Sequence, residues 1–192
     1  MIKFTKIILP ILFIFSILQT ACAPLIITAP TLSSDRRGFD GQIVDQGIEF
    51  SVMSDTQAIN GDFRVDFISF NKKVLVVGQA SNQETIDKII KIVKNTKNVE
   101  QIYNRMTVGK KLSYKAIAND AVITTNIISR ILSQEKTSSL SALLVKVYTE
   151  DRVVYLMGFL SKEEAEQAIN IAQTSKGPKK VVPLIETQNL KK

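Results

Sequence analysis

The sequence contains two copies of one pattern, and this repeat limits the fold more than any other feature. Residues 74–78 (VLVVG) are followed 80 residues later by 154–158 (VYLMG). Each copy is preceded by another apolar run, at 63–70 and at 143–148, in which apolar and polar residues alternate as in half-buried strands. The polar connections between the runs are short enough for hairpins, and they span 71–73 and 149–152. A repeat at a fixed offset predicts two similar units.

A helix is expected after each hairpin, because both copies contain a capping box. Ser81 with Glu84, and Ser161 with Glu164, have the spacing at which a serine and a glutamate satisfy each other's backbone N–H groups. Apolar residues then recur at helical spacing in both copies. A last strand is predicted at 99–108 in the first copy and at 180–186 in the second.

A helix is also expected before each hairpin, at about 42–60 and at 115–134. Each copy is therefore predicted to run helix, strand, strand, helix, strand. The compact arrangement of such a unit is a three-stranded mixed sheet packed against two helices, which is an α+β fold. The expected domains are residues 42–110 and 111–187, followed by a basic tail at 188–192.

The N-terminus has the pattern of an export signal. Lys3 and Lys6 precede a short apolar run, and small residues lead to Cys22, which is the one cysteine of the chain. This pattern predicts a lipoprotein signal peptide at 1–21, with Cys22 acylated as the new N-terminus; the alternative is an ordinary signal peptide with an incidental cysteine. Residues 22–41 are expected to form a tether between the lipid anchor and the first domain.

Composition excludes several classes of chemistry. The chain has no histidine and no cysteine besides Cys22, so Cys/His metal sites, Ser-His-Asp triads and Cys-His nucleophiles are not available. Paired acids occur at Glu163–Glu164 and at Glu150–Asp151, but their expected places are a helix start and a hairpin turn. We therefore expect no enzymatic activity, no metal and no cofactor.

The charge indicates an anionic partner. The formal net charge is +7, and it is +5 without Lys3 and Lys6. A moderate basic excess suits a lipid headgroup surface or nucleic acid. Because an exported protein seldom meets nucleic acid, the lipid surface is the expected partner.

The paired glycine-ended hairpins behind a lipidation pattern resemble the BON domain family, and in particular the dual-BON outer-membrane lipoproteins of the DolP type. The resemblance covers nearly all of the mature chain. The stretches that carry it are residues 35–37, 45–48, 74–79, 119–125 and 156–158.

This resemblance implies a non-enzymatic protein that binds anionic phospholipid, phosphatidylglycerol in particular. It implies a lipid-anchored protein on the inner leaflet of the outer membrane, facing the periplasm, that supports envelope integrity at division sites. Ala23 after Cys22, in place of aspartate, agrees with outer-membrane sorting. The resemblance also associates the chain with the outer-membrane protein assembly machinery, so the alternative function is that of a protein–protein adaptor.

The resemblance places the lipid contact on the helix at 115–134. Isoleucines fill one side of this helix on a helical wheel, and Val122 lies on the opposite, polar side. Val122 stands where the relatives carry a tryptophan that enters the lipid interface, although a single exposed valine is ordinary on any protein surface. The candidate phospholipid-binding residues are Lys115, Ala118, Asn119, Val122, Asn126 and Arg130.

Overall fold

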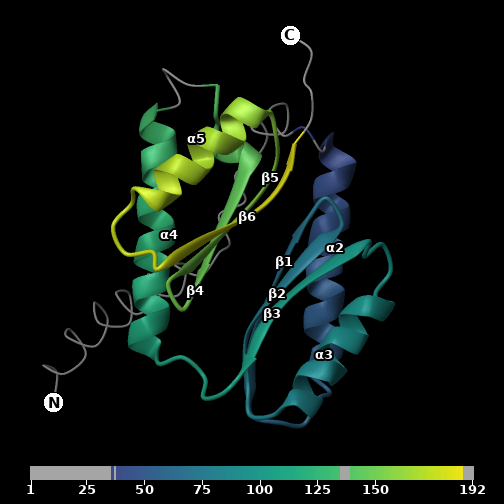
Figure 1. Ribbon diagram of the computed structural model, residues 1–192. Helices are drawn as coiled ribbons and strands as arrows, with labels where there is room; N and C mark the ends of the chain where they lie inside the picture. The colour runs from purple at the N-terminus through teal and green to yellow at the C-terminus, as the bar shows by residue number, and fades with distance from the viewer. Residues whose placement is uncertain (1–35, 37, 135–138, 188–192) are drawn as a thin grey trace, which may run out of the picture. The chain divides into compact units, whose positions relative to one another are not determined.

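The computed structural model describes residues 36, 38–134 and 139–187 (Figure 1). Cys22, the expected signal peptide, most of the expected tether and the basic tail at 188–192 lie outside the described residues. All described elements belong to one compact unit, Thr31–Lys192.

The described chain forms two units with the same order of elements. The first comprises α2 (Gly38–Thr56), β1 (Phe63–Phe70), β2 (Lys73–Ala80), α3 (Gln83–Asn95) and β3 (Gln101–Val108). The second comprises α4 (Tyr114–Gln134), the 3₁₀ turn η3 (Ala142–Leu144), β4 (Val145–Glu150), β5 (Val153–Leu160), α5 (Lys162–Gln173) and β6 (Lys180–Thr187). In each sheet the central strand is antiparallel to the strand before it and parallel to the strand after it. The predicted α+β fold with two mixed sheets is confirmed.

Two predicted boundaries were wrong. Helix α2 begins at Gly38 and ends at Thr56, instead of spanning 42–60; beyond Thr56 the N–H groups of Gln57 and Ile59 bond to carbonyls three residues back, so the chain turns. The strand predicted at 143–148 begins only at Val145, because the preceding residues form η3, which the Ser141 side chain caps.

One of the two predicted capping boxes is present. Ser161 and Glu164 cap α5 reciprocally, as expected. Helix α3 is instead capped by Asn82, whose side chain accepts a hydrogen bond from the Thr85 N–H at 2.9 Å. The second helices are thus offset by 79 residues where the central strands are offset by 80, so the counterpart of Ser161 is Asn82 and not Ser81.

Both hairpins turn in two residues. Asn71 and Lys72 have positive φ angles, as do Asp151 and Arg152, which is the requirement of a type I′ turn. The predicted connections were therefore too long, and Glu150 belongs to β4 and is buried instead of lying in a turn.

A buried aspartate on the first helix of each unit holds the hairpin turn. The Asp120 carboxylate accepts the N–H groups of Asp151 and Arg152 at 2.7 and 2.8 Å. The Asp45 carboxylate accepts the N–H groups of the Asn71–Lys72 turn at the same two distances. Since Asp45 and Asp120 have the same role, the position on α2 that matches Val122 on α4 is Gly47.

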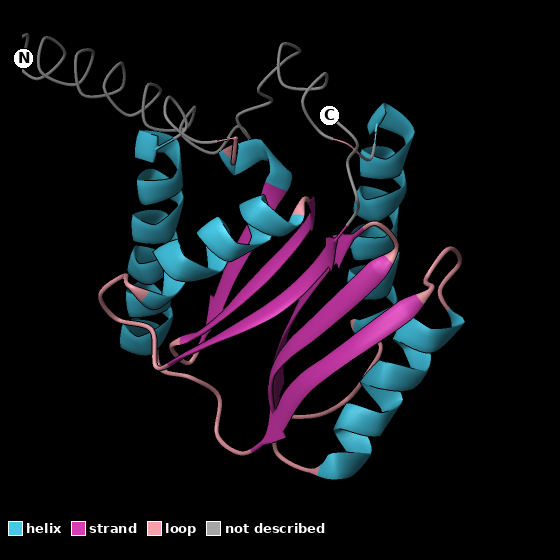
Figure 2. Cartoon of the chain, turned by 45° about the horizontal axis from the view of Figure 1, so that its top comes forward, coloured by secondary structure: helices cyan, strands magenta, loops and turns pink. Residues whose placement is uncertain are grey.

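Each sheet is covered on one face by its own two helices, and the two remaining faces pack against each other (Figures 1 and 2). Val74 and Val76 of β2 point to the helices of the first unit, whereas Leu75 and Val77 point to the second sheet. This alternation explains why the central strands are apolar at nearly every position. The shared cluster buries Ile68, Phe70, Leu75, Val77, Tyr155 and Met157.

Arg36 joins the segment before α2 to the second unit. Its guanidinium donates to both carboxylate oxygens of Glu164, at 2.6 and 2.8 Å, and this hydrogen bonding keeps the pKa of Glu164 below its usual value. Arg36 lies within the expected tether at 22–41, and it has a specific partner in the second unit; Asp35 and Arg37 lie outside the described residues.

Candidate functional site

Helix α4 begins where the chain leaves the first sheet. The linker ends at Ser113, whose hydroxyl accepts the N–H of Ala116 at 3.3 Å and whose carbonyl accepts the N–H of Ile117. The isoleucines at 123, 127 and 131 then fill the core of the second unit, as the wheel predicted. This packing fixes which side of the helix is exposed.

The exposed side of α4 combines apolar, amide and cationic groups. Tyr114 is 92% exposed and Val122 is 67% exposed. With Ala118 between them, they are spaced by four residues and form one stripe along the helix. Lys115, Asn119 and Asn126 are exposed beside this stripe. We call this surface the α4 face; it consists of Tyr114, Lys115, Ala118, Asn119, Val122 and Asn126.

The α4 face carries no exposed carboxylate. Asp120 is the one acid of α4, and it is buried in the hairpin clamp. Within the described part of the chain, neither Lys115 nor Lys110 in the preceding linker has an ion-pair partner, whereas Lys111 pairs with Asp62. The start of α4 therefore presents free cations next to exposed apolar side chains.

Arg130 differs from the other candidate residues. Its guanidinium donates to the Ile171 carbonyl at 2.7 Å, to the Ser175 hydroxyl at 2.6 Å and to the Thr174 hydroxyl at 3.0 Å. Arg130 thus satisfies acceptors at the C-terminal end of α5, where a cation is also stabilised by the negative end of the helix dipole. These hydrogen bonds give Arg130 a role in the fold, so we leave it out of the α4 face although it stands four residues after Asn126.

Tyr114 was missed in the sequence because the helix was expected to begin at residue 115. The signal was present, since 114, 118 and 122 have the i, i+4, i+8 spacing of one helix face. Tyrosine suits a water–lipid boundary because its ring is apolar and its hydroxyl can stay hydrated.

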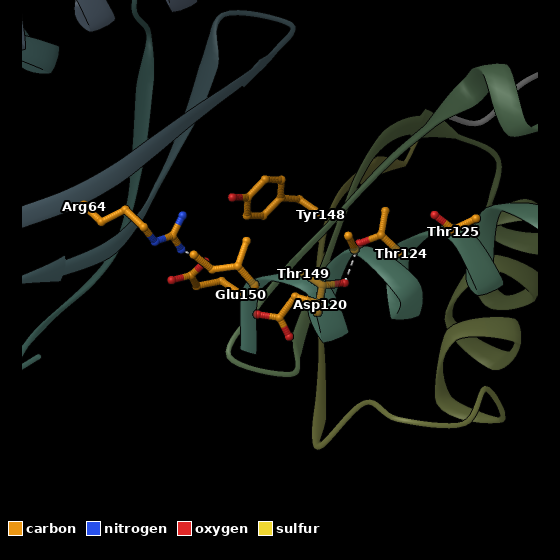
Figure 3. Close-up of a pocket in the computed structure, with 9 residues that line it drawn as sticks. Arg64, Asp120, Thr124, Thr125, Tyr148, Thr149 and Glu150 are labelled. Atoms are coloured by element: carbon orange, nitrogen blue, oxygen red, sulfur yellow. Dashed lines mark hydrogen bonds and ion pairs between the residues drawn. The ribbon is translucent and has the colours of Figure 1, made fainter. Parts of the chain in front are cut away.

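A cavity of about 290 Å³ lies where α4 and β4 meet the first unit (Figure 3). Thr124 and Thr149 lie side by side in its lining, and the Thr124 hydroxyl donates to the Thr149 hydroxyl at 2.7 Å. Arg64 reaches it from β1 and pairs with Glu150. The lining residues are Arg64, Ile117, Asp120, Ala121, Thr124, Thr125, Tyr148, Thr149 and Glu150.

Charged side chains at this cavity form ion pairs with one another. Arg64 also pairs with Asp66, and Asp66 accepts the Tyr148 hydroxyl at 2.7 Å. Burial raises the pKa of Tyr148 above its usual value, so Tyr148 stays protonated and donates. Gln79 donates to Glu150 at 2.6 Å and accepts the Leu112 N–H, which ties the linker to both units. We therefore assign the cavity to the junction of the units and not to ligand chemistry.

The matching helix of the first unit has a different exposed side. Ile43, Phe50 and Met53 of α2 are each more than half exposed, and Phe50 and Met53 border a cavity of about 340 Å³. Helix α2 contains four acids and no base, whereas α4 contains one acid and two bases. We call this surface the α2 patch; it consists of Ile43, Phe50 and Met53.

No helix in the described part of the chain is long and apolar enough to cross a membrane. No group of three or more acidic, histidine or cysteine side chains in the described ranges is arranged to hold a metal ion.

The fold is that of a tandem α+β module, and one helix of it exposes apolar, amide and cationic side chains together. Comparison with known proteins identifies the family: the BON domain matches residues 49–110 and 119–189. The chain belongs to the BON domain family. It is 30% identical over 161 residues to outer membrane lipoprotein DolP of Haemophilus influenzae, with 82% of each chain covered. It is also 30% identical over 146 residues to the 21 kDa hemolysin of Actinobacillus pleuropneumoniae, with 76% of this chain and 73% of the relative covered.

The similarity to solved structures is remote. CdsD, a structural protein of the type III secretion system of Chlamydia trachomatis, matches with 11% identity and a TM-score of 0.27, over 72% of this chain and 91% of that one.

Proposed function

We propose that this protein is a non-enzymatic outer-membrane lipoprotein that binds anionic phospholipid through the α4 face. The observation that carries the proposal is the composition of that face. An exposed tyrosine and an exposed valine lie beside Lys115, and the single acid of the helix is buried. Such a surface can insert apolar groups at a lipid interface while its cations meet anionic headgroups.

The charge contrast between the two first helices supports the choice of α4. An anionic bilayer attracts the start of α4, and it repels the two exposed acids of α2, Asp40 and Asp55. The second BON domain is therefore the one that we expect to meet the membrane. Phosphatidylglycerol is the proposed ligand because its headgroup is anionic and because the resemblance to dual-BON lipoproteins implies it.

The proposed location is the outer membrane, facing the periplasm, with the chain anchored by an acylated Cys22. The signal pattern before Cys22 supports this anchor, as does the name of the relative from Haemophilus influenzae, which is an outer membrane lipoprotein. In this setting the protein would support envelope integrity, with division sites as the proposed place of action.

Vesicle titration of the form that starts at Ala23 tests the lipid site without the acyl chain. This form retains the compact unit that contains every described element. We expect binding to phosphatidylglycerol vesicles and little binding to phosphatidylcholine vesicles. Lys115→Glu should weaken binding about tenfold or more, most at low salt, because it replaces an attraction with a repulsion. Val122→Trp should strengthen binding, because it adds apolar area and an interfacial N–H.

A melting curve of each variant separates lipid binding from stability. Val122 is exposed, so Val122→Trp should leave the melting temperature nearly unchanged. Unchanged binding in Lys115→Glu, together with unchanged binding in Val122→Trp, would remove the α4 face from the proposal.

The α2 patch favours a second candidate function, that of a protein–protein adaptor. Exposed Phe50 and Met53 among acidic side chains suit a partner with an apolar and basic surface. The outer-membrane protein assembly machinery is the proposed partner in this case. Crosslinking in cells from a photoreactive residue at position 50, with position 122 as the comparison site, distinguishes the two functions: protein adducts at 50 favour the adaptor, and lipid adducts at 122 favour the membrane site.

A further inference from the structure

The first domain has a cationic cavity that is remote in sequence from the α4 face. It has a volume of about 470 Å³ and lies between the chain that leaves α2 and the exposed side of α3. We call it the lysine cavity; it is lined by Ala58, Ile59, Asn60, Lys88, Lys91, Ile92 and Asn95.

The lining combines three kinds of group. Ile59 and Ile92 are half-buried and supply apolar surface. Asn60 and Asn95 supply exposed amides that can donate hydrogen bonds. Lys88 and Lys91 supply ammonium groups, and none of the lining residues is an acid. A phosphate ester with an uncharged organic part matches this set, since it needs donors and cations for the oxygens and an apolar surface for the carbon skeleton.

The charge of this region is largely uncompensated. Lys88, Lys91, Lys94 and Lys97 recur every three residues, and no acid occurs between 88 and 99. Lys88 pairs with Glu84 at 2.6 Å, but within the described chain Lys91 has no ion-pair partner. Two further acids are near, Asp87 one helical turn before Lys91 and Asp55 at an adjoining cavity, and neither lines this one; Asp87 accepts a hydrogen bond from Gln83. Lys91 is thus the free cation at the cavity.

The fold itself does not require these lysines, and the second domain shows this. When α3 and α5 are matched by their N-caps, Asn82 and Ser161, the counterparts of Lys88, Lys91 and Lys94 are Gln167, Asn170 and Gln173. The helix dipole favours a cation only in the last turn, where Lys94 stands. The dipole therefore does not account for Lys88 and Lys91 beside a cavity.

We propose that the lysine cavity binds a phosphate ester, with Lys91 and Lys88 on the phosphate and Ile59 and Ile92 against the organic part. The source of this group is either the headgroup of a phospholipid or a soluble phosphate ester. The proposal is independent of the α4 face, because it concerns different residues in the other domain.

NMR titration of the ¹⁵N-labelled chain from Ala23 tests the proposal. The probes are short-chain phosphatidylglycerol below its micelle concentration, and glycerol 3-phosphate. We expect concentration-dependent shifts of the amide signals of Asn60, Ile92 and Asn95. Tighter binding of the lipid than of glycerol 3-phosphate assigns the site to lipid, because only the lipid places acyl carbons on the isoleucines; equal binding assigns it to a soluble ester.

Lys91→Gln and Lys94→Gln are the matched variants. Both remove one exposed, positively charged side chain from α3, but only Lys91 lines the cavity. Lys91→Gln should raise the dissociation constant about fivefold, and Lys94→Gln less than about twofold. Equal losses in the two variants, or no shift at Asn60, Ile92 and Asn95 with either probe, overturn the proposal. The amide signals of Ala118 to Asn126 in the same spectra report binding at the α4 face. Loss of binding at the lysine cavity can therefore be told apart from loss of binding at the α4 face.

Discussion

The two BON domains share a fold and differ in what they expose. Both have a three-stranded mixed sheet, a two-residue hairpin turn and a buried aspartate that holds this turn. On the same framework, α2 exposes three large apolar side chains together with the acids Asp40 and Asp55, whereas α4 exposes Tyr114 and Val122 near free cations. The repeat thus serves as an internal control: features present in both domains belong to the fold, and features present in one are candidates for function.

The second helices of the two domains, α3 and α5, also differ in charge. Helix α3 of the first domain is the cationic one, with a lysine at every third position from 88. Helix α5 has neutral side chains at the counterpart positions. Each domain therefore presents a cationic surface on one helix only, and the two helices are not equivalent. This arrangement would give an anionic ligand two different sites, one on each domain.

The largest expected effect on stability is at Gly78 and Gly158, the matching glycines of the two central strands. A Cβ at Gly78 would lie 2.0 Å from the Arg64 carbonyl oxygen, and its φ of +131° is strained for any other residue. A Cβ at Gly158 would lie 2.8 Å from the Leu144 carbonyl oxygen, without a positive φ. We expect Gly78→Ala to cost about 4 kcal/mol or more in unfolding free energy, and Gly158→Ala about 1–3 kcal/mol.

Urea denaturation of both glycine variants measures this difference. Gly109→Ala in the linker is the control, because nothing lies within 4 Å of its Cβ position. Equal losses at 78 and 158 would mean that the two hairpins tolerate a side chain alike, and that the positive φ of Gly78 has no energetic weight.

The next effect concerns the junction of the domains. Arg64→Ala removes the cationic partner of Glu150, which is 6% exposed and would retain only Gln79. Removal of one partner of a buried ion pair costs about 3–5 kcal/mol. Lys72→Ala is the control, since its pair with Glu100 is exposed and should be worth less than about 1 kcal/mol.

Thermal unfolding followed by calorimetry reports whether this junction couples the domains. We expect one transition in the wild-type chain, because the two sheets share a buried cluster. Arg64→Ala should lower the transition temperature and broaden it or divide it in two. A variant as stable as Lys72→Ala would show that the sheets stay together through apolar contacts alone.

A smaller effect is expected at the paired aspartates. Asp120→Asn replaces one of two carboxylate oxygens that accept buried N–H groups, and should cost about 1–3 kcal/mol. Asp45→Asn should cost somewhat more, because Asp45 also accepts the Ser69 hydroxyl at 2.7 Å. Asp87→Asn on the exposed side of α3 is the control. Melting temperatures in the opposite order would indicate that the two clamps are not equivalent.

The order of elements could be predicted from sequence because the physical signals are local. Strand alternation, the Ser161 capping box and the isoleucine side of α4 each depend on residues a few positions apart. The error at Ser81 arose because the offset of the repeat changes from 80 to 79 between the strand and the helix, which only the Asn82 hydrogen bond reveals. Helix ends are set by such single contacts.

The packing of the two sheets could not be predicted in the same way. Strand β2 has apolar residues on both faces, and its sequence does not tell whether the second face meets a helix, a sheet or another chain. The pairing of Arg64 with Glu150 joins residues 86 positions apart, so no spacing rule finds it. The role of Arg130 at the end of α5 is of the same kind, because its acceptors come from another helix. Candidate site residues chosen from one helix therefore need the tertiary structure to separate ligand contacts from fold contacts.

The smallest expected effect decides which first helix meets the membrane. Tyr114→Ala removes an aromatic side chain that is 92% exposed, so it should leave stability almost unchanged and weaken binding to phosphatidylglycerol vesicles about fivefold, equivalent to about 1 kcal/mol. Phe50→Ala is the matched variant on α2, since Phe50 is an aromatic residue of similar size that is 68% exposed. It should leave vesicle binding unchanged, because the acids of α2 keep that helix away from an anionic surface. Equal weakening by the two variants would mean that both domains contact lipid, and weakening by Phe50→Ala alone would reverse the assignment. The difference between the two dissociation constants therefore measures directly how far two copies of one fold have separated in function.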